Sequence, residues 1–524
     1  MSSVSQSPDA GMSGGATWPR PGLILLLVAG AASGLALPPT GLWWLLFATV
    51  PLLLLRLESL PHGALRSAFI SGLSFGFGYF IVAFHWIGYA FFVNAADLWM
   101  MPFAVGGLAL FMACYWGIAA ACAALVPQHL VPRWLSSILL LSVAEWLRGH
   151  LLTGFPWSVP GLASDGMGAV DQLASIVGMN GLTLLVLVWS AAPALLFVTW
   201  QRHRRIAWPA VALVLTLPLA QAWGMWRLAA HPPAFEGQAV VRLVQPNIAQ
   251  DDKWRSDNSE AIFSTLVTLS QEGAQAAGVS HVVWPESSVP FLLDEDEEAL
   301  HRIGTMLKPG RTLVAGAIRR GPAGEGEPPY FTSILAINEA GEVTGTYDKW
   351  RLVPGGEFLP FEGLLSRIGF RKVVSLPESF TAGKGPSNLQ LPGIGPAGAL
   401  ICYEVIFPDA LVAQVRPRLL VNVTNDGWFG LSTGPHQHLA QARLRSIEQG
   451  LPLFRAANTG ISAVIDPLGR ILAQTQLNTR TTIDSRVPQS LDATFYARTG
   501  DLMLALLIAA AGFLLRGMMI TRAA

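Results

Sequence analysis

LICYE, residues 400–404, is a short apolar run that ends abruptly in polar residues. Such a run predicts a buried strand, which would carry the thiol of Cys402 to the edge of a sheet. The other two cysteines, Cys114 and Cys122, lie inside one apolar stretch and are expected to be plain core residues. Cys402 itself is either a small buried hydrophobic residue or a nucleophile.

Two segments upstream carry the groups that a thiol nucleophile needs. VWPESS, residues 283–288, places Glu286 after an apolar run, and YDKW, residues 347–350, contains Lys349. A carboxylate can accept the proton of the thiol, and a nearby cation or base lowers the pKa of a cysteine. Taken singly, Glu286 is an ordinary loop acid and Lys349 an ordinary surface lysine. The set of three predicts covalent acyl chemistry.

The composition is that of a membrane protein. Of 524 residues, 52% are hydrophobic and 13% are charged, and the mean hydropathy is +0.45, far from the average of soluble proteins. The 34 basic and 34 acidic residues balance. Balanced charge argues against nucleic acid as a partner, because phosphate binding needs an excess of Lys and Arg. Lipids and proteins remain as the expected partners.

Eight apolar stretches are expected to cross the membrane, since a span of ~30 Å of hydrocarbon takes about 20 residues. They lie near residues 21–38, 41–57, 69–93, 101–126, 133–148, 180–200, 206–226 and 501–516. The first stretch follows Arg20 and could be a cleaved signal peptide. The further spans at close spacing favour a retained helix.

The arginines between these stretches predict the orientation. With a cytoplasmic N-terminus, the short outer loops hold little basic charge beyond Arg148, and the positive-inside rule places residues 228–500 outside the cytoplasmic membrane. The arginines on the cytoplasmic side are then Arg20, Arg56, Arg66, Arg133, Arg202, Arg204, Arg205, Arg516 and Arg522. The expected organisation is a disordered cytoplasmic tail at 1–20, a seven-helix transmembrane domain at 21–227, an outer domain at 237–490, an eighth span at 501–516 and a cytoplasmic tail at 517–524.

The outer domain has the pattern of a layered α/β fold. Polar residues, Gly and Pro return, and apolar runs shrink to strand length. The expected strands are 239–245, 281–284, 312–318, 332–337, 343–347, 397–402, 419–423, 461–465 and 471–474, and the expected helices are 259–276, 297–307 and 436–449. Apolar strands that alternate with helices predict buried sheets. Cys402 is the one cysteine of this domain, so an intramolecular disulfide is not expected there.

Several motifs resemble the nitrilase (carbon–nitrogen hydrolase) superfamily. Glu286 in WPES, Lys349 in YDKWRLVPGGEF and Cys402 in ICYE are similar to its Glu-Lys-Cys triad, and NVTNDGWFG at 422–430 resembles its segment after the cysteine. The resemblance covers most of residues 237–485. It implies an αββα sandwich beside the polytopic helical membrane domain.

The whole chain resembles the apolipoprotein N-acyltransferase family. EWLR at 145–148 and TGFPW at 153–157 are similar to that family's membrane-side signature. The resemblance implies a multi-pass protein of the bacterial inner (cytoplasmic) membrane with its catalytic domain on the periplasmic side. It also implies a ping-pong reaction, in which Cys402 takes the sn-1 acyl chain of phosphatidylethanolamine, or of another phospholipid, as a thioester. The acceptor would be the α-amine of the N-terminal diacylglyceryl-cysteine of an apolipoprotein.

The resemblance also implies roles for supporting residues. Lys349 and the Tyr403 amide would stabilise the oxyanions. The further site residues are Glu357 and Glu404, which support and shape the site, and Trp254, which lies on a substrate-contacting loop. Trp350 is an apolar residue that we expect either to contact substrate or the lipid surface or to pack against the outer helix ends. No cofactor is expected, and His436 and His438 lack the third ligand of a metal site. A monomer is expected.

Two other functions fit parts of the sequence. A membrane-tethered amidase or nitrilase would use the same triad to hydrolyse a small C–N compound, with water as the acceptor. A transporter or lipid-binding scaffold with a degenerate outer domain would not need the intact Glu286, Lys349 and Cys402. The spans also hold few of the ionisable residues that a translocation path needs.

Overall fold

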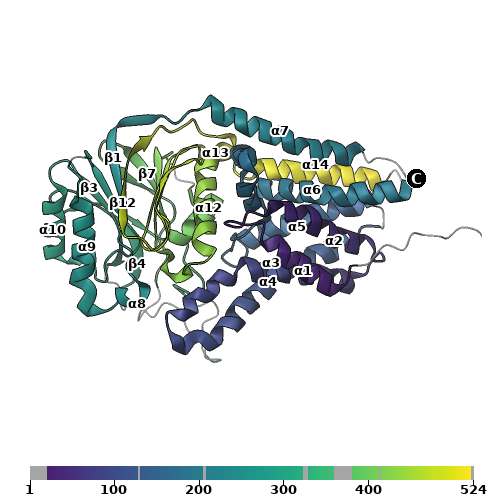
Figure 1. The fold of residues 1–524 in the computed structure, drawn as a ribbon, viewed down its shortest axis with the longest axis horizontal. Coiled ribbons are helices and arrows are strands. Elements are labelled where there is room, and N and C mark those ends of the chain that lie inside the picture. Colours follow the sequence, from purple (N-terminus) through teal and green to yellow (C-terminus); the bar gives the residue numbers. More distant parts are fainter. Residues whose placement is uncertain are drawn as a thin grey trace, which may run out of the picture.

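The fold is that of a computed structural model, which describes residues 21–127, 130–203, 208–275, 277–322, 328–358, 367, 380–411 and 415–520. The tail expected at 1–20 lies outside these residues, as does the end of the C-terminal tail at 521–524. A helical part and an α/β part lie end to end, and the C-terminus is at the far end of the helical part (Figure 1).

The helical part is built from apolar sequence that precedes the α/β part, and one chain segment returns to it after the last strand. Its helices are α1 (Leu23–Gly34), α2 (Leu46–Glu58), α3 (Leu65–Ala83), α4 (Met101–Ala123), α5 (Leu130–His150), α6 (Ala174–His203), α7 (Trp208–Ala230) and α14 (Leu502–Ile520). Within the described ranges, five helical segments are long and apolar enough to cross a membrane, and they contain α3, α4, α6, α7 and α14. The count of eight spans therefore stays a prediction.

The apolar stretch at 69–93, which was expected to form one membrane span, does not form a single helix. The helix α3 ends at Ala83, and a 3₁₀ segment, η2 (His85–Phe92), follows. The ring Nδ1 of His85 lies 2.7 Å from the carbonyl oxygen of Val82. This contact occupies a carbonyl that the next helical turn would otherwise have used.

Glycines bring α1 and α3 into close contact. A Cβ atom on Gly30 would overlap the carbonyl oxygen of Phe75, and a Cβ atom on Gly78 would overlap that of Leu27. The two backbones therefore pack directly against each other, as small residues allow in membrane helices. Both positions require glycine.

The α/β part contains two six-stranded sheets. The first has the order β12-β1-β2-β3-β4-β5 and the second β11-β10-β9-β8-β7-β6. The strands are β1 (Phe235–Gln245), β2 (His281–Trp284), β3 (Thr312–Arg320), β4 (Tyr330–Ile337), β5 (Val343–Asp348), β6 (Asn388–Leu391), β7 (Gly395–Ile401), β8 (Leu419–Thr424), β9 (Leu453–Ala457), β10 (Ala463–Ile465), β11 (Ile471–Gln474) and β12 (Thr481–Pro488). In each sheet three central strands are parallel and the outer strands pair antiparallel.

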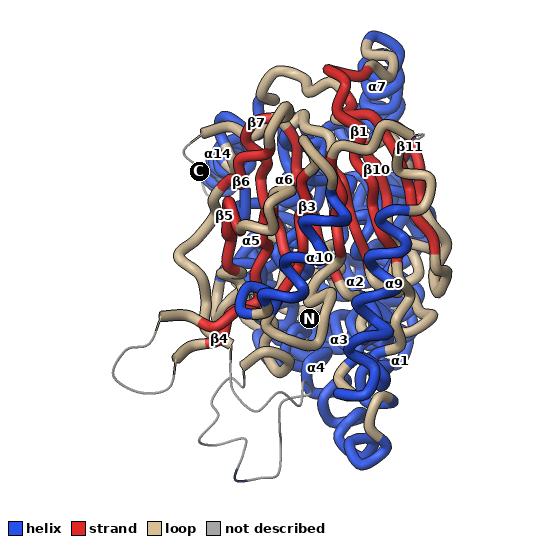
Figure 2. The backbone as a smooth tube through the Cα atoms, turned by 90° about the vertical axis from the view of Figure 1, so that its left-hand side faces the viewer, coloured by secondary structure: helices blue, strands red, loops and turns tan. Residues whose placement is uncertain are grey.

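The two sheets face each other across an apolar core. Val283 and Val314 of the first sheet pack with Ile401, Val421 and Phe454 of the second. The helices α9 (Ser259–Gln271) and α10 (Glu297–Leu307) cover the outer face of the first sheet (Figure 2). The helix α12 (Gly434–Gln449) lies between the second sheet and the helical part (Figure 1). The αββα sandwich expected from the sequence is confirmed.

The helix α12 and the end of β7 join the two parts. The backbone N–H of Met179 in α6 donates a hydrogen bond of 2.7 Å to Glu448 Oε1 in α12. The loop after α5 contacts the turn after β7, where Phe155 stacks on Tyr403 with ring centroids 6.2 Å apart. The thiol expected at the end of β7 therefore lies at the junction of the two parts.

Candidate active site

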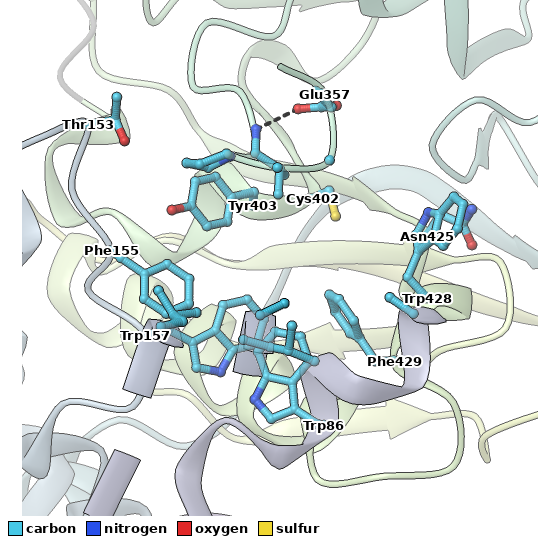
Figure 3. A pocket seen from close by; sticks show the side chains of 18 of the residues that line it. Trp86, Thr153, Phe155, Trp157, Glu357, Cys402, Tyr403, Asn425, Trp428 and Phe429 are labelled. Carbon is cyan, nitrogen blue, oxygen red and sulfur yellow. Dashed lines mark hydrogen bonds between the residues drawn. The ribbon is translucent and has the colours of Figure 1, made fainter. Parts of the chain in front are cut away.

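A cavity of about 950 Å³ lies at this junction, and Glu286, Lys349 and Cys402 all line it. Each of the three follows the end of a strand: β2 ends at Trp284, β5 at Asp348 and β7 at Ile401. The structure therefore brings together three residues that are far apart in the sequence. Figure 3 shows the sulfur of Cys402 facing a set of aromatic rings across the cavity.

Cys402 sits on a strained turn. The strand expected at 397–402 stops one residue early, and Cys402 has a φ of +47° at the start of a 3₁₀ turn. A positive φ is costly for a residue with a side chain, and such strain is common at functional sites. The carbonyl oxygen of Cys402 accepts a hydrogen bond of 3.0 Å from His438 Nε2, and His438 Nδ1 lies 2.9 Å from Asp426 Oδ1. This buried pair holds the turn in place.

Lys349 is buried between two carboxylates. Its Nζ lies 3.2 Å from Glu286 Oε1 and 2.7 Å from Glu357 Oε1, and Figure 3 shows the second bond dashed. The other oxygen of Glu286 accepts a 3.0 Å hydrogen bond from the backbone N–H of Asn425. Glu357 is fixed in turn by the backbone N–H of Val353, at 2.8 Å. The carboxylate of Glu286 is therefore held in one orientation beside the ammonium group.

Burial and the neighbouring charges set the protonation states of Lys349 and Cys402. Burial would lower the pKa of Lys349, but Glu286 and Glu357 outweigh burial and the net pKa lies well above its usual value. Burial, followed by the charge of Glu286, raises the pKa of the Cys402 thiol, and Lys349 opposes that shift only in part. The expectation that the neighbours lower the pKa of this thiol is therefore wrong. The thiol is protonated at rest, so attack requires a base.

Glu404 lies behind the site and not on the cavity wall. Its carboxylate accepts hydrogen bonds from the backbone N–H groups of Ile401 and Trp350, each at 2.8 Å, and from the hydroxyl of Tyr347 at 2.9 Å. Burial raises its pKa to about 7 although these hydrogen bonds act in the opposite direction. Glu404 thus links the ends of β5 and β7, which carry Lys349 and Cys402.

The two tryptophans expected at the site differ in position. Trp254, directly after α8 (Gln250–Lys253), lines the cavity. In the part of the chain that the structure describes, Trp350 does not line the cavity. Its ring packs in the apolar core, and the Arg351 guanidinium lies 4.4 Å from the ring centroid. The backbone N–H of Trp350 is held by Glu404. The expectation that Trp350 lies at the cavity is therefore not met, whereas packing against apolar neighbours is.

Other lining residues were not expected. Lys253 and Asn425 both contact Glu286, through its backbone carbonyl and its carboxylate respectively. Asn425 belongs to the segment 422–430 that the sequence had singled out, so its motif was a usable signal. Lys253 directly precedes Trp254 in the sequence, but the flanking residues give no sign that its ammonium group is buried.

The opposite wall of the cavity is apolar and belongs mostly to the helical part, with Phe429 of the α/β part packed against Trp86 at 4.5 Å between ring centroids. Phe155 and Trp157 come from the loop after α5, and Trp86 comes from η2 (Figure 3). The wall continues along α4 with Phe103, Leu108, Phe111, Met112 and Tyr115. A long apolar channel therefore leads from the helices to the thiol, and it suits an acyl chain better than a small polar compound.

Known families match both parts of the chain. The carbon–nitrogen hydrolase family matches residues 240–495, and the apolipoprotein N-acyltransferase N-terminal domain matches residues 29–192. A protein of Rhodopseudomonas palustris named apolipoprotein N-acyltransferase is 41% identical over 94% of both chains. The chain belongs to the apolipoprotein N-acyltransferase family.

One further relative covers nearly the whole chain, and one solved structure covers about half of it. The apolipoprotein N-acyltransferase of Bradyrhizobium diazoefficiens is also 41% identical, over 94% of each chain. A crystal structure of an amidase from Nesterenkonia sp. covers 53% of this chain and 99% of its own, with 18% identity and a TM-score of 0.37. Membership of the apolipoprotein N-acyltransferase family makes this chain an enzyme with a carbon–nitrogen hydrolase domain and a helical membrane domain.

Proposed function

We propose that this protein transfers the sn-1 acyl chain of phosphatidylethanolamine to the α-amine of the N-terminal diacylglyceryl-cysteine of bacterial lipoproteins. The observation that carries the proposal is the cavity in which Cys402, Glu286 and Lys349 face an apolar channel from the helical part. The relatives' name agrees with the acceptor. The protein would act as a monomer in the inner membrane, with the α/β part on the periplasmic side and without a cofactor.

The first half-reaction acylates the cysteine. Glu286 takes the proton of the Cys402 thiol while the sulfur attacks the ester carbonyl carbon. Lys349 and the backbone N–H of Tyr403 stabilise the oxyanion that forms. When the tetrahedral intermediate collapses, the C–O bond breaks and the lysophospholipid oxygen takes the proton back from Glu286. The products are a thioester and a lysophospholipid.

The second half-reaction transfers the chain to the amine. The neutral α-amine attacks the thioester carbonyl, and the same donors hold the oxyanion. Glu286 accepts a proton from the nitrogen, the C–S bond breaks, and the thiolate regains that proton. The aromatic wall of Trp86, Phe155 and Trp157 supports this step, because a site without water protects a thioester from hydrolysis.

The same residues would also serve a membrane-tethered amidase. An amidase needs a small polar pocket that admits water, whereas the wall along α4 is apolar over several helical turns. The apolar wall favours the lipid substrate. The acceptor therefore separates the two activities: an amine for the transferase and water for the amidase.

Mass spectrometry of the protein with its donor tests the proposal. Purified protein incubated with phosphatidylethanolamine should carry one acyl group on the peptide that contains Cys402, and a diacylglyceryl-cysteine peptide should remove it and become an amide. Cys402→Ala should carry no acyl group, whereas Cys114→Ala, which alters a cysteine of α4, should be acylated normally. An acyl group that persists on Cys402→Ala, or that only water removes, would refute the proposal.

A further inference from the structure

Lys253 differs from the other cations of the cavity. Among the described residues of the lining, three are cationic: Arg148, Lys253 and Lys349. Arg148 pairs with the carboxylate of Glu145 at 2.6 Å, and Lys349 lies between two carboxylates. The ammonium group of Lys253 instead donates to the backbone carbonyl of Glu286, at 3.2 Å, and no carboxylate within the described part of the chain forms a salt bridge with it.

The environment of Lys253 is costly for an ammonium group. The residue is 1% exposed, and a buried charge without a counterion is unfavourable. Burial lowers its pKa to about 8, with the charges of Glu286 and Cys402 acting in the opposite direction. Lys253 therefore remains mostly protonated near neutral pH. A bound anion would relieve the cost.

Lys253 also lies close to the reacting atoms. Its Nζ contacts the backbone of Glu286, whose side chain contacts Lys349. The ring of Trp254 lies on the other side, with its centroid 5.7 Å from the ammonium nitrogen. Lys253 and Cys402 line the same cavity, so an anion at Lys253 would share that cavity with the thiol.

We infer that Lys253 binds the phosphodiester of the phospholipid donor. The inference rests on the proposed function and adds a polar anchor to its apolar channel. The ammonium group acts as a point charge for a phosphate oxygen. With the phosphate held at Lys253 and the acyl chain held along α4, the ester between them is presented to Cys402.

Two donors with the same acyl chains separate phosphate binding from other roles. Acyl-enzyme formation is measured with phosphatidylethanolamine and with the matching diacylglycerol, which has the same ester and no phosphate. The wild type should prefer the phospholipid. Lys253→Met should lose on the order of tenfold to a hundredfold in kcat/KM with the phospholipid, mainly through KM, and much less with diacylglycerol.

Matched variants control for charge and for folding. Lys308→Met removes an exposed lysine after α10 and should leave both rates as in the wild type. Lys253→Arg keeps the charge and should retain the preference for the phospholipid. Equal losses with both donors would mean that Lys253 acts by positioning Glu286, and no loss with either would mean that it has no role; both results overturn the inference.

Measurements on the wild type keep the inference testable if Lys253→Met does not fold. Equal kcat/KM for diacylglycerol and phosphatidylethanolamine would overturn it. Inorganic phosphate should raise the KM for phosphatidylethanolamine more than chloride does at equal ionic strength and should leave the rate with diacylglycerol unchanged; equal inhibition with both donors would overturn the inference. If the wild type formed no acyl-enzyme with the phospholipid, the proposed function itself would fail, which is a distinct result.

Discussion

The hydroxyl of Tyr403 donates a hydrogen bond of 3.1 Å to the carbonyl oxygen of Gly154. Tyr403 directly follows the candidate nucleophile, and Gly154 belongs to the loop after α5. Both groups are buried, and the neighbouring Phe155 stacks on the tyrosine ring. The turn that carries the thiol is therefore anchored to the helical part of the molecule.

Tyr403→Phe should weaken this anchor. The ring contacts remain, but the carbonyl of Gly154 loses its donor, which costs about 1–3 kcal/mol for a buried group. We expect a lower midpoint of thermal unfolding in detergent and slower acylation. Tyr330→Phe, at a half-buried tyrosine at the start of β4, is the control. Equal midpoints for wild type and Tyr403→Phe would show that the bond contributes nothing.

Glu404→Gln should destabilise the protein although it preserves shape. Both carboxylate oxygens accept hydrogen bonds, from Ile401 and Tyr347 on one side and from Trp350 on the other. An amide must turn its NH₂ group toward one of these donor sets, which leaves buried donors unpaired at about 1–3 kcal/mol each.

The unfolding midpoint of Glu404→Gln should fall by roughly 2–4 °C for each kcal/mol lost. Glu339→Gln, at an exposed turn, should melt as the wild type does. If Glu404→Gln and Glu339→Gln had the same unfolding midpoint, the hydrogen bonds of Ile401, Tyr347 and Trp350 to Glu404 would have no energetic role.

Lys349→Met should slow acyl-enzyme formation by about 10²–10³-fold, the usual loss for one oxyanion donor. The change also leaves Glu286 and Glu357 side by side without the cation between them. Rapid-quench measurement of the acylated peptide gives the rate. Lys384→Met, at an exposed lysine, should acylate normally, and a loss below tenfold in Lys349→Met would contradict the assigned role.

His281 should make stability depend on pH. Burial lowers its pKa from 6.5 to about 4. The unfolded chain therefore takes up a proton as the pH falls below 6.5, whereas the folded protein does so only near 4, and about 3 kcal/mol of stability is lost across that window. His281→Gln should show a smaller fall in unfolding midpoint between pH 7 and pH 4.5 than the wild type. His301→Gln, at an exposed histidine, should keep the full fall.

The contact between α1 and α3 should not tolerate a methyl group. Gly78→Ala places its Cβ against the carbonyl of Leu27, and overpacking of this kind costs about 1–3 kcal/mol. Gly106→Ala is the matched control, because its Cβ would meet nothing within 4 Å. A thermal midpoint for Gly78→Ala at or above that of Gly106→Ala would contradict the close packing of these helices.

The sequence predicted the α/β strands best where they are apolar. The strand at 281–284 and the helix at 297–307 match β2 and α10 residue for residue. Three strands were missed: β6 has four residues, β9 carries the buried Arg455 in its centre, and β12 is mostly polar. Arg455 is buried because Asp426 pairs with it at 2.8 Å, and such a partner is not visible in the local sequence.

The site could be predicted only in part. Strand ends in a layered sheet meet at one edge, so Glu286, Lys349 and Cys402 could be expected together. The burial of Lys253 and the packing of Trp350 in the apolar core depend on contacts between distant segments. The raised pKa of Cys402 has the same origin, since its first cause is burial, and the residue packs in the core that both sheets form.

Most of the aromatic wall opposite Cys402 comes from the helical part, whereas Glu286, Lys349 and Cys402 come from the α/β part. Under the proposed function, one set of three side chains would serve a hydrolase or a transferase equally well, and the exclusion of water decides between them. The exclusion of water depends on Trp86, Phe155 and Trp157, and none of these three residues lies in the carbon–nitrogen hydrolase domain. If the proposed function holds, a change in the helical part that admitted water to the thioester would let lipid cleavage compete with acyl transfer.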